Sequence, residues 1–321
     1  MAELDNVLNK IPVVAVVGPT ASGKTRLGVD LALRLNGEVV SADSMQIYQG
    51  MSIATAKPTA AEMQGVPHHL VDFLPPEERY SVARYVADAK AVIADITARG
   101  KLPVLVGGTG LYVDSLLGGI RFSQEQSVPE LRAELYAQAA QLGNTAMHAA
   151  LAEIDPDYAA ALHPNNLGRV LRALELYRTT GITMSEQLKS SREKPSDYAP
   201  VMLGLNFSDR MLLYDRINCR VDAMLEQGLL DEVQAFYRAH DPKTAAQAIG
   251  CKEFLDYLNG AKTCAQCTED LKRETRRYAK RQLTWFKRNA DITWLYHDEF
   301  DSYQALLDKA SGIISNKLMP L

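Results

Sequence analysis

The sequence predicts an α/β fold: a parallel sheet with a phosphate-binding loop, covered by helices on both faces and interrupted by a smaller all-helical insertion domain. Three observations support this. A strand pattern runs through a glycine-rich turn into a helix at residues 13–35, two more strand patterns alternate with a helix before residue 120, and residues 121–200 show helical periodicity alone. Alternating strands and helices favour a parallel sheet. We therefore expect a catalytic core over residues 1–120 and 201–321, with the insertion over residues 121–200.

The first strand is predicted by the apolar, β-branched run from Val13 to Val17, which is typical of a buried parallel strand. Leucines then recur at helical spacing up to Asn36-Gly37, which predicts a helix over residues 24–35. Residues 38–42 and 102–106 are predicted as the second and third strands, with a helix over residues 81–99 between them.

Helical patterns replace strand patterns beyond residue 121, at residues 129–142, 145–154 and 167–179. Residues 201–207 then read as a strand that rejoins the sheet, followed by a helix with a buried apolar stripe. Arg216 and Arg220 lie four residues apart, so they share another face of that helix.

The composition is that of an ordinary globular protein, with 47% hydrophobic and 23% charged residues in 321. We expect a cytoplasmic protein with no membrane segment, because the longest apolar run is far shorter than the ~20 residues that a spanning helix needs. The net charge is −4, which by itself argues against a nucleic-acid partner. Residues 272–288, however, hold eight basic residues against one acid, a net charge of +7 that leaves −11 for the rest.

A phosphate-binding motif, G-x-x-x-x-G-K-[ST], follows the first predicted strand and opens the first predicted helix. Backbone N–H groups and the helix N-terminus bind an anion in such a loop, the lysine reaches a terminal phosphate, and the Thr25 hydroxyl can bind Mg²⁺. The motif leaves open whether the group belongs to ATP, another nucleotide or a different pyrophosphate. The residues assigned to phosphate binding are Gly18, Thr20, Ala21, Ser22, Gly23, Lys24 and Thr25.

Two further segments end at the carboxyl edge of the predicted sheet, where ligands bind in open α/β sheets. The second strand delivers Asp43, whose carboxylate can hold Mg²⁺ through water, accept a proton from a nucleophile, or only cap a turn. The third strand delivers Gly107-Gly108-Thr109-Gly110, where small residues and a hydroxyl allow close approach by a ligand. Helical spacing in residues 272–288 turns Ala279, Leu283 and Phe286 inward, so we favour an outward basic face for a nucleic-acid backbone over a solvated surface.

An ordered set of strings resembles the tRNA dimethylallyltransferase (tRNA isopentenyltransferase) family. The strings are GPTASGKT at residues 18–25, DSMQIY at 43–48, TAKP at 55–58, GVPHH at 65–69, GGTGLY at 107–112, NLGRVLRALE at 166–175, RINCRVD at 216–222 and RYAKRQLTWF at 277–286. This resemblance implies transfer of a dimethylallyl group from dimethylallyl diphosphate to the N6 amine of the adenosine 3′-adjacent to the anticodon, with release of diphosphate. The phosphate loop would hold the pyrophosphate of the prenyl donor.

The resemblance also implies residue roles. Asp43 would take the proton from the adenine amine, Arg220 would stabilise the departing diphosphate together with Lys24 and Mg²⁺, and Thr109 would contact the substrate from the opposite side. The insertion and the basic helix would grip the tRNA anticodon stem-loop of a monomeric enzyme. The implied tRNA contacts are Asp43, Ser44, Met45, Gln46, Thr109, Arg132, Gly168, Arg169, Val170, Leu171, Arg172, Gln247, Ala248, Ile249, Gly250, Cys251, Lys252, Arg277, Lys280 and Arg281.

Two other functions fit a phosphate loop followed by a carboxylate. One is a small-molecule kinase with Asp43 as its base, and the other is an adenylate isopentenyltransferase that uses a free nucleotide. The basic segment and the insertion favour tRNA over both, because neither alternative needs a long phosphate-tracking surface. The sequence departs from the family pattern at Ala54, where glycine is frequent, and at Cys251, where an aromatic residue is common.

Overall fold

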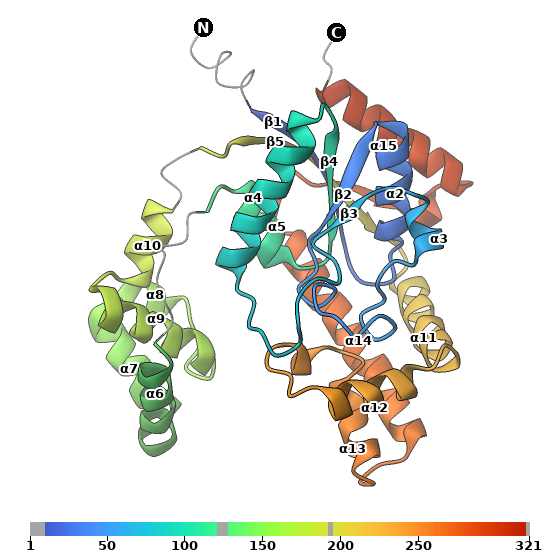
Figure 1. Cartoon of the computed structure of the whole chain (residues 1–321). Helices are drawn as coiled ribbons and strands as arrows, with labels where there is room; N and C mark the ends of the chain where they lie inside the picture. Colours follow the sequence, from blue (N-terminus) through green and yellow to red (C-terminus); the bar gives the residue numbers. More distant parts are fainter. Residues whose placement is uncertain (1–9, 121–127, 192–194, 319–321) are drawn as a thin grey trace, which may run out of the picture. The chain divides into compact units, whose positions relative to one another are not determined.

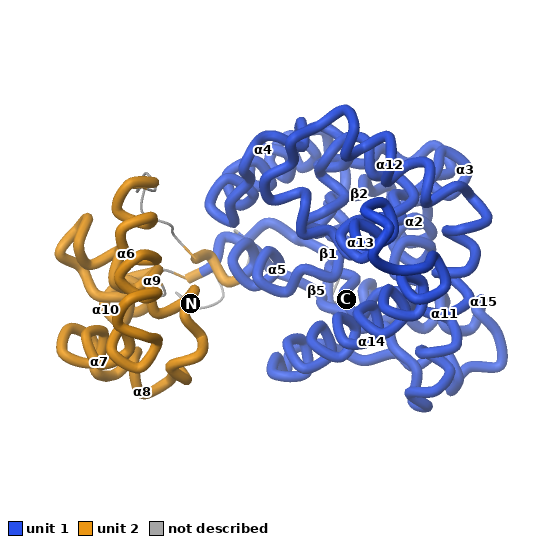
Figure 2. The backbone as a smooth tube through the Cα atoms, turned by 90° about the horizontal axis from the view of Figure 1, so that it is seen from below, with its two compact units in different colours: residues 1–117, 196–321 blue, residues 118–195 orange. Residues whose placement is uncertain are grey.

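The computed structural model describes residues 10–120, 128–191 and 195–318. The chain divides into two compact units, residues 1–117 with 196–321 and residues 118–195 (Figure 2). The insertion expected from the sequence was 121–200, and its expected first residues, 121–127, lie outside the described ranges. Within the described ranges, no helix combines the length and apolar character needed to cross a membrane.

The first unit is built on six parallel strands in the order β3-β2-β4-β1-β5-β6, which confirms the predicted fold class. The strands are β1 (Ile11–Val17), β2 (Gly37–Ser41), β3 (His68–His69), β4 (Leu102–Gly107), β5 (Tyr198–Asn206) and β6 (Thr293–Tyr296). The central strand β1 pairs with β4 and β5, with Val14 opposite Val104 and Val201. The strand after the insertion therefore does rejoin the sheet.

Helices cover both faces of this sheet (Figure 1). One face carries α2 (Lys24–Arg34) and α15 (Tyr303–Leu318), and the other carries α4 (Val82–Ala98) and α5 (Gly110–Leu117). The unit is completed by α3 (Ala60–Met63), α11 (Arg210–Glu226), α12 (Leu229–Ala239), α13 (Leu255–Leu258), α14 (Cys264–Phe286) and the short 3-10 helices η1 (Ala245–Gln247), η2 (Lys252–Phe254) and η3 (His297–Glu299).

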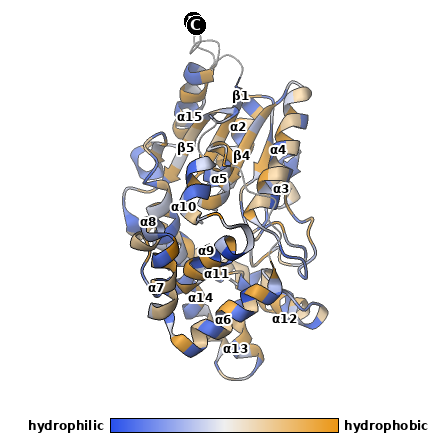
Figure 3. Ribbon diagram, turned by 90° about the vertical axis from the view of Figure 1, so that its left-hand side faces the viewer, coloured by the Kyte–Doolittle hydropathy of each residue, from blue (hydrophilic) through white to orange (hydrophobic). Residues whose placement is uncertain are grey.

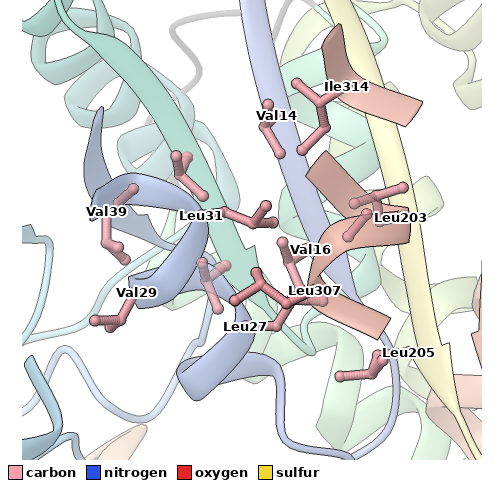
Figure 4. Close-up of a cluster of buried hydrophobic side chains, with 14 of the residues drawn as sticks. Val14, Val16, Leu27, Val29, Leu31, Val39, Leu203, Leu205, Leu307 and Ile314 are labelled. Atoms are coloured by element: carbon pink, nitrogen blue, oxygen red, sulfur yellow. The ribbon is translucent and has the colours of Figure 1, made fainter. Parts of the chain in front are cut away.

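The main hydrophobic core lies between the sheet and the helices α2 and α15 (Figure 4). Alternate residues of β1, Val14 and Val16, point into it and meet Leu27 and Leu31 of α2, which lie one helical turn apart. The central strands are apolar on both faces, which Figure 3 shows as largely orange ribbon. All six strands run parallel, and so their carboxyl ends meet at a single edge.

The second unit is a helical body with its own core. Its helices are α6 (Pro129–Leu142), α7 (Asn144–Ile154), α8 (Pro156–Ala160), α9 (Leu167–Thr180) and α10 (Met184–Ser190). Leu135 of α6, Leu151 of α7 and Leu174 of α9 are all buried in one cluster. Asp155 caps α8 and also accepts hydrogen bonds from the backbone and hydroxyl groups of Ser185, which ties α10 to the bundle.

Candidate active site

The phosphate loop connects β1 to α2 at the carboxyl edge of the sheet. Gly18, Ala21 and Gly23 have φ values of 140°, 62° and 87°, a run of left-handed conformations that curls the backbone. A Cβ atom at Gly18 would lie 2.3 Å from the carbonyl oxygen of Leu205, so only glycine fits there. The loop ends at the N-terminus of α2, where backbone N–H groups lack intrahelical partners and favour an anion.

Two cations converge on this loop. The Lys24 ammonium donates to the Pro19 carbonyl at 2.6 Å, and the Arg220 guanidinium of α11 donates to the Thr20 hydroxyl at 3.3 Å. Burial, together with the positive charge of Arg220, lowers the pKa of Lys24 to about 7, and burial also lowers the pKa of Arg220. Neither cation has a carboxylate within 4.0 Å among the described residues. Two such cations without an acidic partner indicate an anionic ligand.

Asp43 stands just beyond the end of β2 and faces the same space. Its Oδ1 atom accepts hydrogen bonds from the backbone N–H groups of Met45 and Gln46, at 2.9 and 3.2 Å. These two bonds fix the carboxylate, and within the described ranges its Oδ2 atom has no hydrogen-bond partner. Asp43 is close enough to Lys24 to oppose the loss of its proton. The carboxylate is therefore positioned to accept a proton from a ligand.

Thr109 follows β4 and lies beside the Asp43 segment. Its hydroxyl oxygen accepts a hydrogen bond from the backbone N–H of Ser44 at 3.0 Å and lies 3.3 Å from the Ser44 hydroxyl. Tyr278 of α14 lines the same cavity as Asp43. Burial and the charge of Asp43 raise the pKa of Tyr278, which keeps its phenol neutral. Of the three predicted catalytic residues, Asp43 and Arg220 line one cavity, and Thr109 is hydrogen-bonded to Ser44 in the wall of that cavity.

A cavity of about 320 Å³ joins these groups, and a second of about 840 Å³ adjoins it. Lys24, Thr25 and Arg220 line both cavities. The smaller one has Asp43 on its wall and an apolar side whose residues are Met45, Val106, Ile217, Val221, Met224 and Leu271. Cations, an apolar wall and a fixed carboxylate suit a ligand that carries both a phosphate group and a hydrocarbon chain.

Three side chains hold the loop, a role that the sequence did not predict for them. Gln282 of α14 accepts from the Thr20 N–H at 2.8 Å and donates to the Gly108 carbonyl at 3.0 Å, and it is almost fully buried. Arg216 donates to the Ala21 carbonyl at 3.1 Å, and His297 contacts the Ser22 carbonyl at 2.7 Å. Arg216 and Gln282 lie within the strings RINCRVD and RYAKRQLTWF, but neither string indicates a contact with the loop, because each residue becomes a partner of the loop only through the tertiary fold.

Comparison with known proteins shows which family this chain resembles. The family model "IPP transferase" matches residues 46–289, and the model "Isopentenyl transferase" matches residues 11–72. A tRNA dimethylallyltransferase of Caldanaerobacter subterraneus subsp. tengcongensis is 47% identical over 96% of this chain and 99% of that relative. One of Halalkalibacterium halodurans is 49% identical over 96% and 98%. The chain belongs to the tRNA dimethylallyltransferase family.

Solved structures agree with this assignment. The tRNA isopentenylpyrophosphate transferase of Bacillus halodurans has a TM-score of 0.71 and 46% identity, covering 96% of this chain and 98% of that one. A eukaryotic dimethylallyltransferase acting on tRNA has a TM-score of 0.84 and 31% identity, covering 96% and 79%. Members of the tRNA dimethylallyltransferase family are prenyltransferases, so the kinase alternative is wrong.

The predicted tRNA contacts at residues 247–252 divide by burial. Gln247, Ile249 and Lys252 line the smaller cavity and are therefore accessible to a ligand. Their contacts with tRNA remain predictions. The side chains of Ala248 and Cys251 are fully buried, which excludes them as side-chain contacts to RNA in this conformation. Gly250 has a φ of 107° and packs against Ala54, where a Cβ atom would lie 3.2 Å from the Ala54 Cβ. The two departures from the family pattern, Ala54 and Cys251, are both buried, and Gly250, the neighbour of Cys251, packs against Ala54.

The basic helix α14 is less positive at its surface than its sequence suggests. Lys272, Arg273 and Arg277 form ion pairs with Asp222, Asp270 and Glu274, respectively. Lys280 and Arg281 have no acidic partner within 4.0 Å in the described part of the chain, and Arg281 lines the smaller cavity beside Tyr278. Ala279 and Phe286 are buried as predicted. Arg276, Lys287 and Arg288 also lack an acidic partner within 4.0 Å among the described residues, and of the basic residues in this segment Arg281 lines the smaller cavity.

The helical unit carries the remaining predicted contacts. Arg132 and Arg172 both contact the buried carboxylate of Glu175, at 2.6 and 3.0 Å. Gly168 and Arg169 are exposed. Val170 and Leu171, however, are buried in the core of this unit, because α9 turns their face toward α6 and α7. The expectation that the side chains of Val170 and Leu171 contact tRNA is therefore wrong for this conformation. The tRNA contacts of the other residues remain predictions, namely those of Gly168, Arg169, Arg132 and Arg172.

Proposed function

We propose that this enzyme transfers a dimethylallyl group from dimethylallyl diphosphate to the N6 amine of the adenosine 3′-adjacent to the tRNA anticodon. The relatives and neighbours named above are tRNA dimethylallyltransferases, one of them described as acting on tRNA. The observation that carries the proposal for this chain is the pairing of two cations, Lys24 and Arg220, with a fixed carboxylate, Asp43, around one partly apolar cavity.

The reaction forms one bond and breaks one. The adenine N6 atom attacks the allylic carbon, the bond from that carbon to the diphosphate oxygen breaks, and the electron pair leaves with the diphosphate. Lys24, Arg220 and the loop N–H groups stabilise the negative charge as it grows, which lowers the barrier selectively. Asp43 Oδ2 accepts the proton that N6 loses. Thr109 and Tyr278 border the same position and orient the amine.

Mg²⁺ fits this set of donors. The Thr25 hydroxyl and the Asp43 carboxylate line the same cavity and are the hard oxygen groups that Mg²⁺ prefers. In the described residues no cluster of three His, Cys, Asp or Glu side chains is available, so the protein would supply few of the ligands itself. When bound, Mg²⁺ would supply additional positive charge at the diphosphate. We propose Thr25 as its direct protein contact.

The adenosine must leave its stack to reach this cavity. An N6 amine within a stacked anticodon loop is inaccessible, so we propose that the base is extruded toward Asp43 past Ser44, Met45 and Gln46. Gln46 is fixed by hydrogen bonds to the carbonyls of Thr55 and Ala56, at 3.2 and 2.9 Å. We propose that Lys280, Arg281 and the exposed residues of the helical unit bind the backbone of the anticodon stem-loop.

We further propose that the enzyme acts as a monomer in the cytoplasm. The groups assigned above to the candidate active site all come from one unit of one chain, which supports a monomer. Light scattering of the purified protein tests the first statement. The second rests on the expectation that the tRNA substrate is in the cytoplasm.

Transfer of label tests the function directly. The enzyme is incubated with labelled dimethylallyl diphosphate and Mg²⁺ in parallel reactions that contain bulk tRNA or AMP, and a third reaction contains labelled ATP. We expect label in tRNA, at N6 of the adenosine 3′-adjacent to the anticodon, found by digestion and mass spectrometry. Label in AMP alone would assign an adenylate isopentenyltransferase instead. Label at another nucleotide would refute the proposed position.

A further inference from the structure

His297, the first residue of η3, contacts the phosphate loop. Its Nε2 atom lies 2.7 Å from the Ser22 carbonyl oxygen, and because a carbonyl only accepts, Nε2 is the donor. The imidazole stacks on Phe207, with ring centroids 4.9 Å apart and an interplanar angle of 20°. A Cβ atom at Gly23 would lie 3.3 Å from Nε2, so the ring packs directly against the loop.

This contact orients the peptide that follows Ser22. The structure has no cis peptide bonds in its described ranges, so the Ser22 carbonyl and the Gly23 N–H point in opposite directions. His297 holds the carbonyl, so the Gly23 N–H points away from His297. Gly23 and Lys24 both line the larger cavity. The hydrogen bond from His297 thus sets the direction of a donor at the start of α2.

Asp298, the residue after His297, holds the start of α11, the helix that carries Arg216 and Arg220. Asp298 accepts hydrogen bonds from the backbone N–H groups of Ser208 and Asp209, at 2.8 and 3.1 Å, immediately before α11 begins. Arg216 of α11 donates in turn to the Ala21 carbonyl. One short segment therefore fixes the loop directly, through His297, and indirectly, through α11. The left-handed conformation of Ala21 is costly without such support, because Ala21 is not glycine.

We propose that His297 is a positioning residue for the diphosphate, and that its hydrogen bond to Ser22 keeps the phosphate loop in the form that binds the leaving group. This inference rests on the proposed function. His297 contacts no substrate atom in the proposed reaction. It acts through the loop backbone, so its loss affects diphosphate binding and departure and leaves tRNA binding intact.

The direct test measures binding of inorganic pyrophosphate and of tRNA separately by calorimetry. His297→Phe keeps an aromatic ring for Phe207 and removes the donor, and we expect pyrophosphate to bind about fivefold more weakly. The KM for dimethylallyl diphosphate should rise and kcat should fall, while the Kd for tRNA stays within about twofold. His297→Gln places an amide donor at a similar reach and should restore most of the affinity. His297→Asn is too short and should not.

A control separates positioning from stability. Ile314→Ala removes a buried side chain of α15 without touching the loop, so it should lower Tm and leave pyrophosphate binding unchanged. Equal pyrophosphate affinity in His297→Phe and the wild type overturns the inference, as does equal affinity in the Gln and Asn variants. The Gln and Asn pair decides the matter if His297→Phe does not fold. Failure of the wild type to bind pyrophosphate or modify tRNA would refute the proposed function instead.

Discussion

Gln282 accepts a hydrogen bond from the backbone N–H of Thr20 at 2.8 Å, and this contact joins the basic helix α14 to the phosphate loop. The same side chain donates to the Gly108 carbonyl at 3.0 Å. A single buried amide therefore connects the loops after β1 and β4 with the helix proposed to bind RNA. Both of its polar ends are used, which is the condition for placing such a group in a protein interior.

Replacement of Gln282 by Leu should lower stability. It leaves the Thr20 N–H and the Gly108 carbonyl without their partner, and an unsatisfied buried polar group costs about 1–3 kcal/mol. Urea unfolding would measure the change in free energy. The matched control is Gln304→Leu, an exposed position on α15, which should change stability little. A Gln282→Leu protein as stable as the wild type would contradict the structural role of this amide.

Gly108 should not tolerate a side chain. A Cβ atom there would lie 2.0 Å from Gln282 Nε2, so Gly108→Ala must displace the amide that holds the phosphate loop. We expect at least a tenfold fall in kcat/KM for dimethylallyl diphosphate, about the effect of 1.4 kcal/mol. Gly312→Ala is the control: no atom lies within 4 Å of its Cβ position, and the residue is in helix α15, where alanine is preferred. Equal activity of the two variants would show that the amide has room to move.

The depressed pKa of Lys24 predicts a pH dependence of diphosphate binding. Burial and Arg220 lower this pKa to about 7, so the free enzyme loses the charge of Lys24 as the pH rises through about 7. The affinity for pyrophosphate should fall over that interval. The Lys24→Arg variant keeps its positive charge throughout this interval, and pyrophosphate itself titrates equally in both experiments. The ratio of the wild-type affinity to the variant affinity therefore reports the charge of Lys24 alone. A ratio that does not change between about pH 6 and 9 would contradict the depressed pKa.

The unpaired cations of α14 predict a salt dependence of tRNA binding. Replacement of Lys280 and Arg281 by Ala should weaken tRNA binding and reduce the slope of log K against log salt by about one per charge. Lys262 serves as the control, because it is already paired with Asp256 and Asp270 and its loss should leave the slope unchanged. An unaltered slope in the double variant would show that this face of α14 is merely solvated.

Local sequence patterns predicted the centre of this fold well. The strands that became β1, β4 and β5 are buried over most of their length, so their apolar runs are strong signals, and the phosphate loop is a contiguous motif. The edge strands were missed because β3 has two residues and β6 has four, too few for a periodic pattern. The burial of Val170 and Leu171 was also missed, since a family string identifies residues and does not say which helix face they occupy.

The partners of the site were harder to predict than the site itself. Asp43, Thr109 and the phosphate loop follow strands that end at one edge, and this alone places them together. Gln282 and His297 lie more than 200 residues from the loop they hold, and a pairing over that distance leaves no local signature. The basic segment was predicted from its charge. Asp270 and Glu274 lie one helical turn from the arginines that they pair with, whereas Asp222 of α11 becomes a neighbour of Lys272 only in the folded chain.

The central claim is that Asp43 takes the proton from the adenine amine. Asp43→Asn is close to isosteric and keeps an oxygen for the N–H groups of Met45 and Gln46, so the loop should remain in place. The decisive measurement is the single-turnover rate of dimethylallyl transfer at saturating tRNA and dimethylallyl diphosphate, beside the Kd for tRNA. We predict a rate about 10²- to 10⁴-fold below that of the wild type, with unchanged tRNA affinity. A near wild-type rate for bound substrate would contradict the account.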